Sequence, residues 1–218
     1  MKRVFIKDVV LEEKNHLAGF IENIRDKKSI CFIVLRDISG KIQLTINKNE
    51  NPHLSDIIAQ LTIDSVIHVE GKIIKNDNVK LNGIEMIVEN IKVDSIALPS
   101  PILAPKGEET EIDLKLDYRW IDLRTDKNLL IFKVQTEYVR LCREFLYNKN
   151  FIEIHSPKLL GAASESGAEV FSVNYFDGKA FLAQSPQFYK QMAIASGFER
   201  IFETGPVFRA EKSHSRKH

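Results

Sequence analysis

Residues 29–47 read SICFIVLRDISGKIQLTIN and indicate two short strands joined by a turn. In the second strand, apolar Ile42, Leu44 and Ile46 alternate with polar residues, which is the period of a strand with one buried face. The Ile-Ser-Gly sequence at 38–40 supplies the turn. We therefore expect a β-hairpin here.

Further elements of the same domain are predicted on both sides of this hairpin. A strand is expected at 16–25, a helix at 52–61, and two more strands at 65–75 and 83–97. Three strands, a helix and two strands in under a hundred residues match the five-stranded barrel of the OB fold. An SH3-like barrel or a small α+β sandwich would also fit this order of elements.

Composition and charge exclude several classes of protein. The chain has 218 residues, and its 31 Lys and Arg against 30 Asp and Glu give a net charge of +1, so a nucleic-acid site must be a local patch. No apolar run reaches the roughly 18–20 residues of a membrane span, and the N-terminus has no apolar signal core. Cys31 and Cys142 form neither a disulfide framework nor a zinc pattern. We expect both as reduced core residues of a cytoplasmic protein without a membrane partner.

The sequence changes character at LPSPILAPKGEET, which holds three of the seven prolines and has no periodicity. We expect a first domain at 1–97, a linker at 98–115 and a second, α+β domain at 116–218. The elements predicted in the second domain are helices at 128–150 and 186–196 and strands at 151–155, 168–176, 179–184 and 201–209.

Taken one at a time, the polar residues of the second domain are ordinary. Arg209 and Glu211 would share one side of an extended strand, but a surface ion pair explains such a pair equally well. Gln187 and Lys190 share one face of a helix that Ser185 could cap, and a solvated helix face explains them too. The polar loop at 164–167 could be a simple turn.

In combination, these segments resemble the class II aspartyl-tRNA synthetases of archaea and eukaryotes. The segments that carry the resemblance are DYRWIDLRT (117–125), FKVQTEYVRLCREFLYNKNFIEIHSP (132–157), SESGAEVFSVNYF (164–176), FLAQSPQFYKQM (181–192) and FETGPVFRAE (202–211). In this family the helix and strand ending in proline form motif 1, which builds a homodimer interface, and the strand ending in Phe-Arg-x-Glu begins motif 2. The resemblance implies a catalytic domain built on an antiparallel sheet.

The resemblance also implies an ATP site that works with Mg²⁺. Arg209 matches the arginine that stabilises charge on the α-phosphate, a task suited to a rigid guanidinium. Glu211 matches the acceptor for the adenine amino group, and His218 matches a γ-phosphate contact. Arg216 and Lys217 keep the positive charge of the family's motif 2 loop without its residue identities, so we assign them no contact.

An aspartate pocket is implied in the same way. Glu165 and Gln187 match the acceptors for the ammonium group of the amino acid, and Lys190 matches the cation that binds its side-chain carboxylate. Such a pocket rejects asparagine, because a neutral amide would leave a buried cation uncompensated. Ser185 either helps to shape the pocket or caps its own helix.

In the first domain, the resemblance implies an anticodon-binding barrel. OB folds bind single strands by stacking bases on aromatic side chains within a basic groove. Phe32, in its setting after Arg25, matches the ring that stacks under the central anticodon base of tRNA(Asp), and Gln43 matches the reader of that base. Glu85 matches the reader of the third base through a cytosine amino group. A core position for Phe32 and a solvated one for Gln43 are the alternatives.

The chain stops at His218, inside motif 2. The family's catalytic domain continues through the Mg²⁺-binding strand and motif 3, so we expect no metal ligands in this chain and no aminoacylation by it alone. The predicted function of the complete protein is aspartate–tRNA ligase. Asparaginyl- and lysyl-tRNA synthetases, or a non-catalytic RNA-binding module, are the alternatives. Charging of asparagine tRNA is left open.

Overall fold

The computed structural model describes residues 2–102, 110–162 and 170–210. Its contacts divide the chain into two compact units, Met1–Thr125 and Asp126–His218. The linker predicted at 98–115 stays a prediction. No helix among the described residues is long and apolar enough to cross a membrane.

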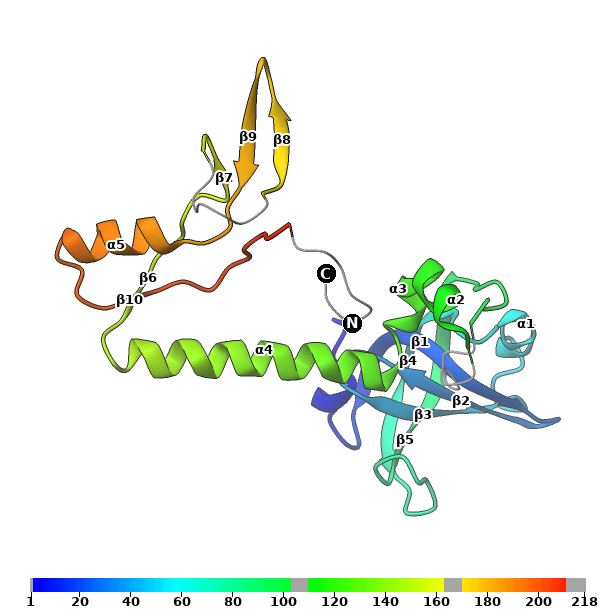
Figure 1. Cartoon of the computed structure of the whole chain (residues 1–218). Coiled ribbons are helices and arrows are strands. Elements are labelled where there is room, and N and C mark those ends of the chain that lie inside the picture. The colour runs from blue at the N-terminus through cyan, green and yellow to red at the C-terminus, as the bar shows by residue number, and fades with distance from the viewer. Residues whose placement is uncertain (1, 103–109, 163–169, 211–218) are drawn as a thin grey trace. The chain divides into compact units, whose positions relative to one another are not determined.

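The first unit contains a closed β-barrel with strand order β1-β2-β3-β5-β4 (Figure 1). Its elements are β1 (Lys14–Asp26), β2 (Ile30–Arg36), β3 (Lys41–Asn47), α1 (Leu54–Gln60), β4 (Val66–Lys75) and β5 (Ile84–Ser95), after a 3₁₀ turn η1 (Ile6–Asp8). All neighbouring strands are antiparallel except β3 and β5, which are parallel. The predicted five-stranded OB barrel is confirmed, and the SH3-like and sandwich alternatives are excluded.

The barrel core comes from the alternation seen in the sequence. Ile42, Leu44 and Ile46 on β3 are each 0% exposed, and Ile33 and Leu35 on β2 face them from the next strand. Apolar burial of this kind stabilises a fold by about 25 cal/mol per Å² of area removed from water.

Two strand glycines let the barrel close. A Cβ on Gly19 would lie 2.3 Å from the carbonyl oxygen of Arg36, and one on Gly71 would lie 2.1 Å from that of Ile87. Any side chain at either position would therefore push two strands apart.

The turn between β2 and β3 is organised by one carboxylate. Asp37 Oδ1 accepts hydrogen bonds from the backbone N–H groups of Ser39 at 2.7 Å and Gly40 at 3.0 Å. Asp37 Oδ2 accepts from the N–H of Ile6 at 2.9 Å and so ties the N-terminal segment to the barrel. Burial by itself raises the pKa of Asp37, but the hydrogen bond that the Ser39 hydroxyl donates to Oδ1 at 2.6 Å and these backbone hydrogen bonds outweigh burial and hold the pKa below its ordinary value.

Two short helices follow the barrel, α2 (Ile112–Asp117) and α3 (Arg119–Asp122). Neither helix was predicted from the sequence, because four to six residues are too few to establish a helical period. Arg124 comes just after α3. Its guanidinium carbon lies 4.6 Å from the centroid of the Phe20 ring, and its Nη1 lies 3.6 Å from Asp64 Oδ1. These contacts hold the end of the first unit against the barrel.

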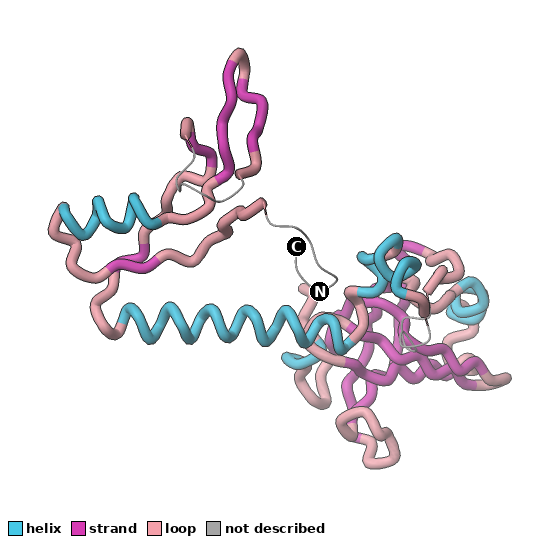
Figure 2. Tube along the Cα trace, in the orientation of Figure 1, coloured by secondary structure: helices cyan, strands magenta, loops and turns pink. Residues whose placement is uncertain are grey.

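The second unit is α+β. Its elements are α4 (Asp126–Tyr147), β6 (Ile152–Glu153), β7 (Leu159–Leu160), β8 (Ser172–Tyr175), β9 (Gly178–Leu182), α5 (Gln187–Ala195) and β10 (Ile201–Phe202). Strands β7, β9 and β8 form an antiparallel sheet, as predicted, and β6 and β10 form a separate parallel pair. Figure 2 shows how much of this unit is helix and loop rather than sheet.

The structure corrects two expectations. The strand predicted at 201–209 is paired only at Ile201–Phe202, because the extended chain beyond it has no continuous partner strand among the described residues. Cys31 is buried, and burial together with nearby Asp26 raises its pKa to about 11, but Cys142 is exposed. The prediction for Cys142 was wrong, because α4 has no buried residue in the structure.

Candidate functional site

The outer face of the barrel carries the residues predicted to contact an anticodon. Phe32 lies between Cys31 and Ile33, both 0% exposed, so its own side chain points away from the core and the core alternative is excluded. The strand register places Arg25 of β1 on one side of Phe32 and Thr45 of β3 on the other. The half-buried ring therefore lies on the outer face with an exposed arginine beside it.

A lysine adds to the positive charge near this ring. Lys27 Nζ, from the turn between β1 and β2, lies 5.6 Å from the centroid of Phe32. A ring flanked by Lys27 and Arg25 has the chemistry of a base-stacking platform in a basic groove. Lys27 was not among the residues predicted from the sequence to contact RNA.

Gln43 and Glu85 lie directly opposite each other in the parallel pair β3 and β5. Gln43 Nε2 donates to Glu85 Oε2 at 3.0 Å, Thr45 Oγ1 donates to the same oxygen, and Asn76 Nδ2 donates to Oε1 at 2.6 Å. Glu85 is only 4% exposed. Its carboxylate therefore holds the Gln43 amide in one orientation, and a base that bonded Glu85 directly would have to replace one of these donors.

Thr45 and Asn76 are contributors that the sequence analysis missed. Thr45 could have been predicted from the sequence, because it lies two residues after Gln43 and therefore on the same face of the strand. Asn76 could not have been, because it comes from the turn after β4 and reaches Glu85 only in the folded barrel.

Two further positions of the barrel have a defined local geometry. Glu22 is bound by Lys41, with 2.9 Å between Nζ and Oε2, so it lies in an ion pair on the barrel. Gly83, in the turn before β5, has a φ of 64°, which favours glycine.

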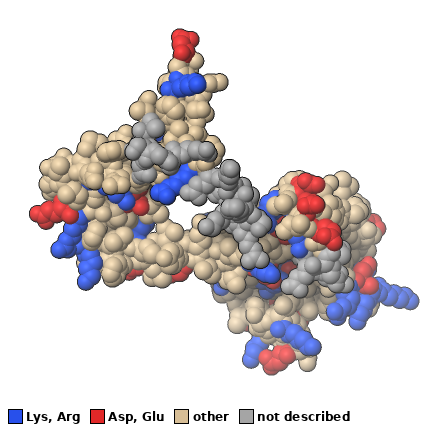
Figure 3. Space-filling view, viewed as in Figure 1, with Lys and Arg blue, Asp and Glu red and all other residues tan. Residues whose placement is uncertain are grey.

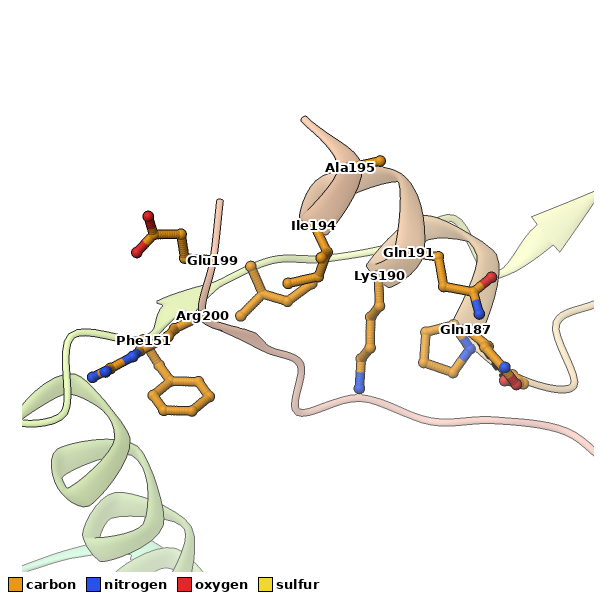
Figure 4. A pocket seen from close by; sticks show the side chains of 11 residues that line it. Phe151, Gln187, Lys190, Gln191, Ile194, Ala195, Glu199 and Arg200 are labelled. Carbon is orange, nitrogen blue, oxygen red and sulfur yellow. Dashed lines mark hydrogen bonds between the residues drawn. The ribbon is translucent and has the colours of Figure 1, made fainter. Parts of the chain in front are cut away.

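In the second unit, a pocket of about 750 Å³ lies along α5. One face of this helix lines the pocket with residues three or four positions apart, which are neighbours on a helix surface: Gln187, Lys190, Gln191 and Ile194. Figure 4 shows Gln187 and Lys190 projecting from the same side of the helix. The structure thus brings together two of the three residues predicted to bind aspartate. Gln191 and Ile194 also line this pocket, and neither was predicted from the sequence to do so.

The start of α5 is fixed by its own residues. The N–H of Gln187 donates to Ser185 Oγ at 3.1 Å, so Ser185 satisfies one of the free donors at the helix start. Ser185 also lines the pocket. The two interpretations of this serine are therefore compatible.

The nucleotide side of the predicted site is only partly described. Arg209 is exposed, and the N–H of the preceding Phe208 donates to the carbonyl of Ala183 at 2.9 Å, which ties this extended segment to the end of β9. Glu165 lies outside the described residues, and so do Glu211, Arg216, Lys217 and His218. Among the described residues, no group of three His, Cys, Asp or Glu side chains could hold a metal ion.

Comparison with known proteins identifies the family of each part of the chain. Residues 16–94 match the model of the OB-fold nucleic-acid-binding domain, and residues 111–218 match that of class II tRNA synthetases (D, K and N). This chain belongs to the class II tRNA synthetases. Its similar relatives include an aspartate–tRNA(Asp) ligase of Picrophilus torridus, 42% identical over 99% of the chain and 51% of the relative. An aspartate–tRNA(Asp/Asn) ligase of Methanopyrus kandleri is 41% identical over 100% of the chain and 52% of the relative.

Solved synthetase structures share the fold. An asparaginyl-tRNA synthetase of Pyrococcus horikoshii, complexed with asparaginyl-adenylate, matches with a TM-score of 0.89 and 31% identity over 100% of the chain and 50% of that protein. An aspartyl-tRNA synthetase of Entamoeba histolytica matches with a TM-score of 0.79 and 29% identity over 100% of the chain and 48% of that protein. The chain thus spans about half the length of the synthetases that it matches.

Proposed function

We propose that this synthetase is an aspartate–tRNA ligase, which activates aspartate with ATP and transfers it to tRNA(Asp) in the cytoplasm. The observation that carries the proposal is the pocket along α5, where Gln187 and Lys190 lie on one helical face. Identity of about 40% to aspartate–tRNA ligases over the whole chain supports it.

The pocket residues suit the two charged ends of aspartate. The Lys190 ammonium binds the side-chain carboxylate, and the Gln187 side-chain oxygen accepts from the substrate ammonium group, together with Glu165 from its loop. Asparagine binds less well, because its neutral amide leaves the Lys190 charge without a counter-ion.

Arg209 carries the electrostatic part of the first step. The aspartate α-carboxylate attacks the α-phosphorus of ATP, negative charge builds on the α-phosphate oxygens, and pyrophosphate leaves. A guanidinium aimed at these oxygens stabilises the transition state. Glu211 and His218 would hold the adenine and the γ-phosphate. Mg²⁺ neutralises phosphate charge in such reactions; among the described residues, no group of three His, Cys, Asp or Glu side chains could hold it.

The barrel is proposed to bind the anticodon of tRNA(Asp). Phe32 stacks under the central base, Gln43 reads its edge, and Arg25 contacts the backbone. Glu85 supports Gln43 through the 3.0 Å hydrogen bond described above and is proposed to read the third base. A homodimer through α4 and the strand after it is proposed as well, supported by the exposed apolar side chains of Tyr138, Leu141 and Phe145.

The decisive experiment is ATP–pyrophosphate exchange by the full-length protein with aspartate, asparagine or lysine offered separately. Exchange with aspartate alone is expected. Exchange with asparagine, the amino acid of the adenylate bound to one structural neighbour, would keep the class of enzyme and overturn the assignment of the pocket. No exchange with any amino acid, together with retained tRNA binding, would favour a non-catalytic RNA-binding module.

A further inference from the structure

A charged cluster that is not part of the pocket lies where β6 and β10 end. Lys158 Nζ lies 2.6 Å from Glu203 Oε1. Ser156 donates to the same carboxylate twice, from its backbone N–H at 3.1 Å and from its Oγ at 2.9 Å. Lys158 Nζ also donates to Ser156 Oγ at 3.0 Å. The three side chains form a closed set of hydrogen bonds.

The carboxylate of this cluster is shielded from water, whereas its lysine partner is partly exposed. The Glu203 side chain is 3% exposed and that of Lys158 is 28% exposed. Burial by itself raises the pKa of Glu203, but the hydrogen bonds from Lys158 and Ser156 outweigh burial and hold the pKa below its ordinary value. Glu203 is therefore an anion at neutral pH, and its geometry depends on its lysine partner.

The backbone of Lys158 connects this pair to both halves of the candidate active site. Its carbonyl accepts a hydrogen bond from the N–H of Ala183 at 2.9 Å, and the carbonyl of Ala183 accepts one from the N–H of Phe208 at 2.9 Å. Ala183 leads within a few residues into α5 and the pocket, and Phe208 directly precedes Arg209. Glu203 begins the extended segment that ends at Arg209.

We propose that Lys158 and Glu203 are a positioning pair that sets Arg209 relative to Gln187 and Lys190 on α5. This inference rests on the proposed function. Lys158 anchors the chain before α5 through its carbonyl and the chain before Arg209 through its ammonium group. Neither residue lines the pocket along α5, so we assign both a positioning role rather than a contact with the amino acid.

A positioning role has a kinetic signature. The pair sets the distance between the amino-acid pocket and Arg209, the group that stabilises the α-phosphate. If Arg209 moves by about 1 Å relative to the pocket, the reaction rate can fall by about 10²-fold. Aspartate itself is bound by residues of α5, which keep their helix. The turnover number should therefore fall while the KM for aspartate stays nearly constant.

The test is Glu203→Asp in the full-length protein, which keeps the charge but shortens the side chain by one methylene. We expect the kcat of aspartate-dependent pyrophosphate exchange, expressed per folded active site, to fall by about 10–10²-fold, with KM for aspartate within about 3-fold. Lys158→Arg, which keeps a donor and a charge, should retain more activity than Lys158→Met. If Lys158→Met fails to fold, the two conservative variants still decide the question.

The matched control is Glu89→Gln, which removes an ion pair of similar length, 2.5 Å from Lys14, on an exposed part of the barrel. It should leave exchange unchanged. Wild-type kcat in folded Glu203→Asp, or a loss that only follows the folded fraction, would overturn the positioning role. An inactive wild-type protein would instead overturn the proposed function, and the inference with it.

Discussion

The barrel and the second unit use apolar residues in opposite ways. In the barrel, the inward side chains of β2 and β3 are 0% exposed, and strand pairing closes on itself. In the second unit, the 22 residues of α4 include none that is buried, and Leu141 on its apolar stripe is 51% exposed. Much of the surface of this unit in the view of Figure 3 is uncharged. A barrel of about a hundred residues can thus complete a core alone, whereas these small sheets and this helix cover little of their own apolar surface.

The largest expected effect tests this difference with matched leucines. Leu44→Ala should lower the free energy of unfolding by about 2–5 kcal/mol, because it leaves a cavity in a closed core. Leu141→Ala should change it by less than about 0.5 kcal/mol at protein concentrations too low for the proposed homodimer, because the face of α4 is then exposed. Urea unfolding of the 218-residue chain, followed by circular dichroism, measures both. A cost above about 2 kcal/mol for Leu141→Ala would mean that its face is covered in solution.

The second-largest expected effect is on catalysis by the second unit, with no effect on RNA binding by the barrel. Arg209→Ala should depress aspartate-dependent pyrophosphate exchange by at least about 10²-fold, or about 2.7 kcal/mol, because charge on the α-phosphate loses its stabiliser. The affinity for tRNA should hardly change, since the proposed anticodon surface is on the barrel. Near wild-type exchange in the full-length variant would remove Arg209 from the α-phosphate.

A variant of the barrel should show the opposite pattern, with weaker RNA binding and unchanged catalysis, and its effect should be smaller. Phe32→Ala should weaken binding of an anticodon stem-loop RNA by about 1–3 kcal/mol, the value for stacking one base, and leave pyrophosphate exchange intact. Phe176→Ala is the matched control, because this phenylalanine is 89% exposed at a hairpin tip of the second unit. An unchanged dissociation constant in filter binding for Phe32→Ala would make its ring an idle part of the barrel surface.

The smallest effect concerns acid stability of the barrel. Because the folded pKa of Asp37 lies below its ordinary value, its contribution is present above about pH 4 and is lost as the pH falls through the folded pKa. Asp37→Asn should therefore cost about 1 kcal/mol at pH 7, with the difference from wild type shrinking toward pH 2. Thermal unfolding at both pH values checks this, and a constant difference would assign the loss to packing.

Local patterns predicted much of the fold, because each depends on neighbours in sequence. Alternation along β2 places Phe32 opposite in direction to Cys31 and Ile33, and this follows from the two-residue period alone. The spacing of Gln187 and Lys190 likewise predicts a shared face of α5. The strand predicted up to 209 failed for the complementary reason, since a strand also needs a partner that its own residues cannot specify.

The sequence by itself determined the order of the barrel strands and α1, the inward face of β3 and, through its motifs, membership of the class II tRNA synthetases. Only the tertiary structure decided that Gln43 meets Glu85 and that Lys158 meets Glu203, pairs that lie 42 and 45 residues apart in the chain. Periodicity reports which way a side chain points, but not what it meets. The partner is fixed by barrel closure and by the pairing of β6 with β10, which depend on the free energy of the whole fold.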